Sequence, residues 1–145
     1  MSDGLHGHGT VLTVNDGTST TTVGNIISIT GPNQARDPID ISTMDSTSKF
    51  REFIPGMLDA GEFTVEINYD GTAAGTANAL NIQKTATAHT WTITLDDAGA
   101  GETNSYWACS GFVTALGHAI PFDDKVTQSL TIKCTGVPTY ADIAT

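Results

Sequence analysis

Residues 42–70 read STMDSTSKFREFIPGMLDAGEFTVEINYD, and this stretch decides the expected fold. In its last part, residues 62–70, apolar and polar side chains alternate strictly, which is the pattern of a strand with one buried face. The apolar face carries Phe63, Val65, Ile67 and Tyr69. The polar face carries Glu62, Thr64, Glu66, Asn68 and Asp70. We therefore predict a strand whose acidic, polar face points away from the core.

The segment 43–61, which precedes this strand, shows no strand alternation, and Pro55-Gly56 interrupts any helix within it. A structureless segment of this length is uncommon in a compact domain unless it is functional or disordered. Its apolar content argues against an idle, solvated linker. We predict a long loop that docks onto another surface; the alternative is that it folds back on its own core. The residues assigned to this contact are Met44, Phe50, Arg51, Phe53, Ile54, Met57 and Leu58.

Charge and length exclude several classes of protein. The chain has 145 residues, a formal net charge of −10 and only six Lys and Arg residues. Because basic residues supply most of the affinity for nucleic acid, a chain this acidic is not expected to bind DNA or RNA. No apolar run approaches the roughly 18 residues of a membrane span. The N-terminus has neither the basic start nor the apolar core of a secretory signal.

Short alternating segments along the chain predict a mainly β fold. The predicted strands are residues 10–14, 23–30, 39–43, 62–70, 90–96, 105–115 and 125–134. Residues 73–86 are rich in alanine with apolar side chains at helical spacing, and they are the one predicted helix. We expect a single domain over residues 1–145, a β-sandwich or partial barrel of about seven strands with one packed α-helix. Residues 1–9 are expected to be a flexible N-terminus, and residues 136–145 a C-terminal tail.

The last predicted strand, 125–134, repeats the two-faced pattern of residues 62–70. Its apolar face carries Val126, Leu130, Ile132 and Cys134, with Gln128 as the one polar exception. Its other face carries Thr127, Ser129, Thr131 and Lys133. Neutral hydroxyl side chains of this kind suit the exposed face of a sheet.

Candidate catalytic groups each have a structural explanation that we favour. Cys109 with His89 or His118 could form a nucleophile and base, but Cys109 lies inside a predicted strand and reads as a packed thiol. Glu62 and Glu66 share a strand face and could act as acid and base. A solvated polar face explains the same pair, so no catalytic site is predicted.

The sequence evidence for a metal site is equally weak. His6 and His8 form an H-x-H pair without a third ligand nearby, and Asp96-Asp97 and Asp123-Asp124 lack the spacing of a calcium loop. No metal or cofactor is predicted. Cys109 and Cys134 are expected to be reduced and buried, with a disulfide as the alternative.

The stretch 44–70 resembles the signature region of the major tail tube proteins of long, flexible-tailed, lambda-like phages. The resemblance extends over roughly residues 23–135. The supporting segments are Ser28-Ile29-Thr30-Gly31-Pro32, Asp37-Pro38-Ile39-Asp40, Thr90-Trp91-Thr92-Ile93 and Gly111-Phe112-Val113. It implies the tail-tube fold, a β-sandwich with one helix, and a structural role in the virion.

The resemblance also implies an assembly. Subunits of the family form hexameric rings that stack into a tube, with strands from every subunit joined in an inner barrel through which DNA passes. The loop 43–61 would then reach a neighbouring subunit or ring. Implied partners are further copies of the chain, with tail terminator, tail tip and tape-measure proteins, and no membrane. The implied location is the virion tail, after assembly in the host cytoplasm.

A channel that conducts DNA should not hold its phosphates, so its wall should lack free Lys and Arg. We therefore expect the following residues to face the lumen: Glu62, Thr64, Glu66, Asn68, Thr127, Ser129 and Thr131. Lys133 departs from this logic and is expected near a rim. The residues alone leave a second function open, a secreted or virion-surface β-sandwich binding module, and an enzyme is the weakest option.

Overall fold

The computed structural model describes residues 7–69, 87–97 and 103–141, and within these ranges the chain forms β-strands. The strands are β1 Val11–Asn15, β2 Thr20–Val23, β3 Ile26–Thr30, β4 Ala35–Asp40, β5 Phe53–Asp59, β6 Glu62–Asn68, β7 His89–Thr94, β8 Tyr106–Ala119 and β9 Thr127–Ala141. The predicted mainly β fold is confirmed, with nine described strands in place of about seven. The helix expected at residues 73–86 lies outside the described residues.

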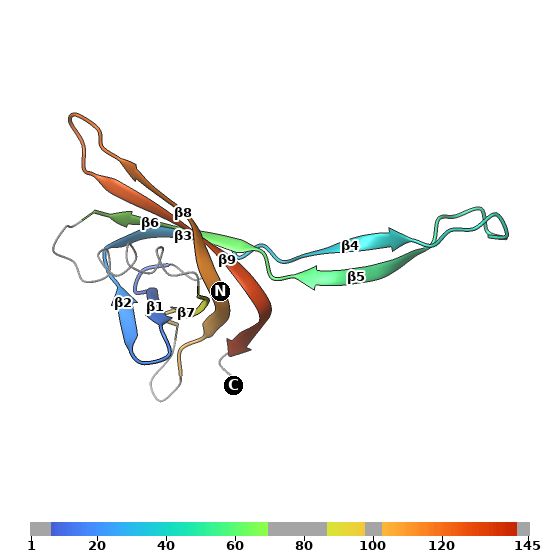
Figure 1. The fold of residues 1–145 in the computed structure, drawn as a ribbon, viewed down its shortest axis with the longest axis horizontal. Coiled ribbons are helices and arrows are strands. Elements are labelled where there is room, and N and C mark those ends of the chain that lie inside the picture. The colour runs from blue at the N-terminus through green and yellow to red at the C-terminus, as the bar shows by residue number, and fades with distance from the viewer. Residues whose placement is uncertain (1–6, 70–86, 98–102, 142–145) are drawn as a thin grey trace, which may run out of the picture.

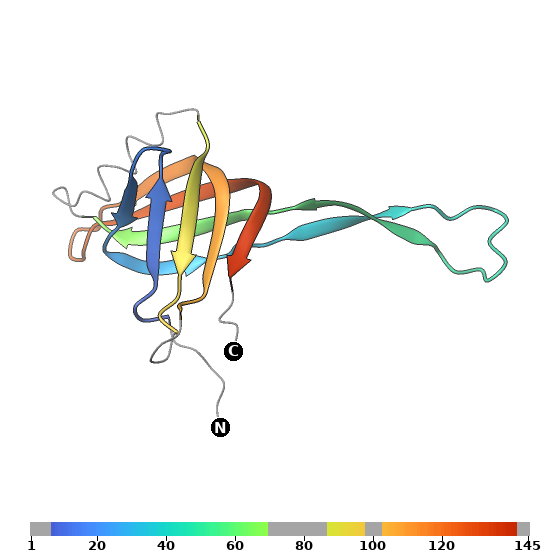
Figure 2. The same ribbon diagram turned by 90° about the horizontal axis from the view of Figure 1, so that it is seen from below.

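Seven strands form one antiparallel sheet in the order β2-β1-β7-β8-β9-β6-β3, and β4 and β5 form a separate two-stranded ribbon. The large sheet folds over itself (Figure 2): β2, β1 and β7 make one layer, and β6 and β3 cross them in the other. The long strands β8 and β9 pass from one layer to the other. Their ladder is irregular at Ala108/Ser110 and at Val113/Ala115, and such bulges bend a strand pair.

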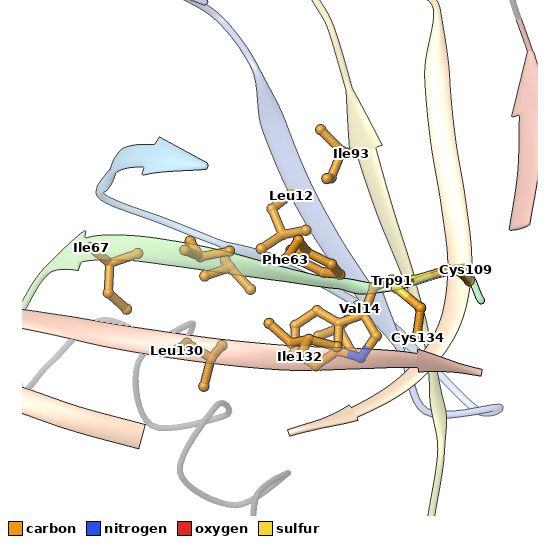
Figure 3. Packing of buried hydrophobic residues seen from close by; sticks show 13 residues of the cluster. Leu12, Val14, Phe63, Ile67, Trp91, Ile93, Cys109, Leu130, Ile132 and Cys134 are labelled. Atoms are coloured by element: carbon orange, nitrogen blue, oxygen red, sulfur yellow. Dashed lines mark hydrogen bonds between the residues drawn. The ribbon is translucent and has the colours of Figure 1, made fainter. Parts of the chain in front are cut away.

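The core lies between the two layers (Figure 3). Phe63 of β6 is its centre and meets the rings of Trp91 and Trp107 edge to face, with centroid distances of 6.2 and 5.9 Å. The indole Nε1 of Trp91 donates a hydrogen bond to the carbonyl of Gly111 at 3.2 Å. Val65 and Ile67 are also buried, so the predicted apolar face of this strand is confirmed up to Ile67. Tyr69, beyond the end of β6, is exposed.

Three predicted boundaries are wrong. Residues 43–61 are not a continuous loop, because β5 occupies Phe53–Asp59 and pairs with β4. Residues 136–141 are not a tail, because they continue β9 alongside β8. The single strand predicted at 23–30 is two strands, β2 and β3, separated by a turn in which Asn25 has a φ of 60°.

The two cysteines face each other across the β8–β9 ladder. Cys109 and Cys134 are free, buried thiols whose Sγ atoms lie 2.7 Å apart. Burial raises the pKa of both thiols. A buried thiol with a raised pKa is a poor nucleophile, which agrees with the packing role favoured for Cys109.

Replacement of Phe63 by alanine should lower the free energy of unfolding by about 3–5 kcal/mol, because the change empties the centre of the core. Urea denaturation followed by tryptophan fluorescence measures this loss. Phe122→Ala is the matched control, since the side chain of Phe122 is fully exposed. Equal stability of the two variants would contradict the assignment of Phe63 to the core.

Candidate functional site

The outer face of β6 and β9 is the first candidate surface. The two strands pair from Glu62↔Lys133 to Asn68↔Thr127. Because opposite residues share a face, this register sets Thr64 beside Thr131 and Glu66 beside Ser129. All seven residues that the sequence predicts to face a lumen therefore lie on one face, opposite the buried Phe63, Val65 and Ile67.

The structure extends this polar face over two more strands. On one side, Ser28 and Thr30 of β3 pair with Glu66 and Thr64. On the other side, Ala115, Gly117 and Ala119 of β8 pair with Thr131, Ser129 and Thr127. These residues could not be predicted from the sequence, because their place on this face depends on pairing between strands that are distant in the chain. We call the outer surface of these four strands the polar face.

One cation interrupts the polar face. The Nζ of Lys133 lies 2.8 Å from Oδ1 of Asp59, at the end of the face where β5 leads into β6. The hydrogen bond from Lys133 lowers the pKa of Asp59, and the same bond raises the pKa of Lys133. The charge of Lys133 is therefore neutralised by a neighbouring carboxylate, while Glu62 and Glu66 stay exposed.

Both margins of the polar face end in unpaired strand edges, among the described residues. β3 pairs with β6 on one side and with no described strand on the other. β8 pairs with β7 only up to Gly111, so residues 112–119 have β9 as their one described partner. Unpaired edges present free backbone donors and acceptors that can pair with another chain.

The β4–β5 ribbon is the second candidate surface, and we call residues 35–59 the arm. It projects from the body as a twisted two-stranded ribbon with no other described element beside it (Figures 1 and 2). The arm therefore does not fold back on its own core in this structure. Pro38 and Pro55 lie opposite each other in it, and prolines are tolerated there because both strands of a ribbon are edges.

All seven residues predicted to make an intersubunit contact are exposed on the arm. Met44 and Met57 are almost fully exposed, and Phe50 at the tip is 79% exposed. Ile39 and Ile41 add to this apolar surface and were missing from the predicted set. Exposed apolar surface of this extent on a single chain marks an interaction site.

The root of the arm is fixed by two close backbone approaches. Gly31 and Gly61 have φ angles of 100° and 79°, in the left-handed region that favours glycine. A Cβ on Gly31 would clash with the carbonyl of Glu62, and one on Gly61 with the carbonyl of Asn33. The carbonyl of Gly61 also accepts a hydrogen bond from the amide of Cys134 at 2.9 Å. These contacts set the direction in which the arm leaves the body.

The groups weighed for catalysis make ordinary structural contacts. His89 Nδ1 lies 2.9 Å from the carbonyl of Thr87, and the His118 ring packs edge to face on Tyr69 at 5.5 Å. Across residues 7–69, 87–97 and 103–141, no three His, Cys, Asp or Glu side chains are arranged to hold a metal. No described helix is long and apolar enough to span a bilayer.

Removal of the Lys133 charge should raise the pKa of Asp59 toward its ordinary value. In Lys133→Gln the lowering of the Asp59 pKa should largely disappear, as measured by carbon-detected NMR titration of the carboxyl group. Asp40 is the internal control, since its pKa is lowered by hydrogen bonds from Ser42 and should not move. An unchanged Asp59 titration would show that the ion pair is absent in solution.

That ion pair also has a defined pH dependence. A lowered folded-state pKa of Asp59 contributes stability above the ordinary value of 3.8, and this contribution is lost as pH falls through the folded pKa. The raised pKa of Lys133 contributes below 10.5, and its contribution is lost as pH rises through the folded value.

Gly61→Ala should lower the free energy of unfolding by roughly 2 kcal/mol or more. Alanine is strained at a positive φ, and its Cβ would also clash with the carbonyl of Asn33. Gly136→Ala is the matched control, since Gly136 has a φ of 76° in open space. Chemical denaturation of both variants separates the clash from the backbone strain. Equal losses would mean that the root contact does not constrain the arm.

Comparison with solved structures shows the same fold in several tubular assemblies. The tail of an empty gene transfer agent particle, refined with C6 symmetry, superposes with a TM-score of 0.77 at 12% identity, over 96% of this chain and all of the other. The tube-terminating cap of the anti-feeding prophage gives 0.73 at 17% identity, over 97% and 93%. The SPP1 tail tube gives 0.64 at 8% identity, over 90% and 75%.

At these identities the likeness is one of fold. No curated protein matches the chain by sequence. The family model described as phage tail tube, lambda-like, matches residues 5–142, which is nearly the whole chain. The chain therefore belongs to the lambda-like family of phage tail tube proteins.

Proposed function

We propose that six copies of this structural virion protein close into a ring, and that the polar face of each copy lines the channel. The observation that carries the proposal is the polar face with an unpaired edge at each margin. The β3 edge of one copy would pair with residues 112–119 of β8 in the next. Each copy would then contribute four strands, and closure of the ring would leave no free edge in the wall of the channel. The C6 symmetry of the similar gene transfer agent tail supports the number six.

The expected barrel is wide enough to be a channel. Six copies with four strands each give about 24 strands, and barrels of about 16–18 strands already leave an aqueous channel. With strands about 4.8 Å apart and tilted by about 40°, the backbone diameter is roughly 50 Å. Side chains of the modest size of Ser, Thr and Glu would line such a bore without filling it.

The chemistry of the polar face suits the passage of DNA. Phosphates are retained by cations, and Lys133 is already bound to Asp59. The exposed Glu62 and Glu66 repel phosphates, and the hydroxyl side chains between them carry no charge. DNA would therefore pass without being held, and we assign the chain no catalytic role.

Further contacts would join rings into a tube. The arm, with its exposed apolar side chains, is suited to reach a neighbouring ring. The ends of the tube would meet a terminator and a tail tip, with a tape-measure protein inside. Tube-terminating and baseplate proteins of the anti-feeding prophage share this fold, which supports such end partners. The protein would assemble in the host cytoplasm and remain in the virion tail.

Electron microscopy of the purified chain tests this proposal. We expect sixfold rings or tubes with an open centre at about 0.15 M salt, where charges farther apart than about 8 Å are screened and the acidic copies repel one another less. Averaged top views would give the number of copies in a ring. Isolated globular particles at every salt and protein concentration would contradict the proposal.

A lysine on the polar face should make the channel retain DNA. In tubes of Ser129→Lys, a fluorescent DNA duplex should co-sediment, and retention should fall steeply with added salt. Thr22→Lys is the matched control, because Thr22 is also an exposed hydroxyl residue on a strand but lies on β2 in the opposite layer. Equal retention by both variants would show that residue 129 does not face the bore.

A further inference from the structure

An open apolar groove runs along the inner side of β3. It encloses about 1010 Å³. One wall is β3 with the following Gly31-Pro32, and the other is formed by the ends of β7, β8 and β9. Its apolar lining includes Ile26, Ile29, Ile93, Leu95, Trp107 and Tyr140. Trp107 packs on both Phe63 and Tyr140, at 5.9 and 6.3 Å between ring centroids, so this wall is held in place by the core.

The end of the groove is acidic. Asp96 directly follows the lining residue Leu95, and its side chain lies against Gly9, which also lines the groove. Asp97 accepts a hydrogen bond from the amide of Ser105, a third lining residue, at 2.8 Å, and hydrogen bonding from the side chain and the amide of Ser105 lowers the pKa of Asp97. No Lys or Arg is among the lining residues, and His8 is the one basic residue there. The groove therefore suits an apolar group that carries positive charge beside it.

The arm tip has this composition. Phe50 is 79% exposed and stands between Lys49 and Arg51. With Arg36, the arm holds three of the six basic residues of the chain, and it also holds five acidic ones, so the positive charge is local to the two neighbours of Phe50. The other exposed aromatic residues in the described part of the chain lack basic neighbours in the sequence. Phe53 follows Glu52, Phe122 precedes Asp123-Asp124, Tyr69 precedes Asp70, and Phe112 and Tyr140 have no charged residue beside them. Charge complementarity therefore selects Phe50.

The tip is also held in a defined shape. The amide of Glu52 donates to Oγ of Ser42 at 2.8 Å, and the amide of Ile41 donates to the carbonyl of Glu52 at 2.9 Å. Lys49 turns the chain with a φ of 61°. A tip that is already ordered loses less conformational entropy when it binds.

The length and direction of the arm indicate that it binds the groove of a second copy and not the groove of its own chain. From Ala35 to Ser46 the arm can reach at most about 35 Å, at roughly 3.3 Å per residue of extended chain. A compact body of the roughly 88 described residues outside the arm is about 30 Å across. The arm points away from its own body and prolongs the direction of β3 and β6 (Figures 1 and 2). A copy displaced by one body length in that direction would lie within reach of the arm, and the β3 wall is part of the surface of that copy.

We propose that Phe50 of one copy docks in the groove of the next copy along the tube, with Arg51 and Lys49 facing Asp96 and Asp97. This inference rests on the proposed function, since it assigns the contact that joins successive rings. Both contact surfaces, the arm tip and the groove, are present on every copy of the chain.

Exchange of charges between the arm tip and the groove tests this proposed contact. Arg51→Glu and Asp96→Arg should each raise the critical concentration for tube formation at least tenfold, as measured by sedimentation and electron microscopy. The double variant should recover at least most of the loss, because it restores opposite charges. Both residues are exposed, so thermal unfolding of each monomer should be unchanged. Single variants that polymerise normally, or a double variant that is not rescued, would overturn the assignment.

A photocrosslink gives a direct reading of the contact. A benzophenone amino acid in place of Phe50, irradiated in assembled tubes, should link to peptides that contain Ile93, Trp107 or Tyr140. The same group in place of Phe122 is the control and should not link there. Tubes whose Phe50 crosslinks fall only elsewhere would refute the groove and leave the proposed function standing. If the wild-type chain forms neither rings nor tubes, the proposed function fails, and the groove assignment fails with it.

Discussion

The register between β6 and β9 is the constraint on which the rest of the structure depends. It places Phe63 against Ile132 and Val65 against Leu130 on one face, and the Thr64–Thr131 and Glu66–Ser129 pairs on the other. Because side chains alternate along a strand, a slip of one residue would move the acids into the core and the aromatics to the surface. The same register brings Lys133 to the root of the arm, where it meets Asp59. Core, polar face and arm attachment therefore follow from one set of pairings.

This register could be anticipated from sequence because one face of each strand is buried and the other is not. Strict alternation in residues 62–68 and 127–134 gave both faces correctly, including the hydroxyl row of β9. Gln128 shows that the buried face of a strand cannot be predicted from apolar side chains alone. It was an exception on the apolar face, and the structure buries it completely beside His118, with 3.4 Å between the Nε2 atoms. Burial followed the position in the strand rather than the polarity of the side chain.

The arm and the sheet margins could not be derived in the same way. Alternation reports burial on one side, whereas both sides of β4 and β5 are largely exposed, so the ribbon carries no such signal. Pro55-Gly56 argues against a helix, which the structure agrees with, but it does not exclude a strand, because a two-stranded ribbon tolerates proline. The continuation of β9 to Ala141 depends on the other half of β8, and the free edges depend on which strands lack partners. These are relations between distant segments, and no local pattern encodes them.

The single arm on each chain gives an assembly a direction. A contact between an arm on one copy and a different surface on the next is heterologous, and such contacts continue without limit unless a ring closes them. A column of the proposed hexameric rings would have two unlike ends: one would present six free arms and the other six unoccupied receiving surfaces. Growth and capping at the two ends would then depend on different surfaces of the protein. A capping protein must imitate an arm at one end or a receiving surface at the other, and it cannot serve both.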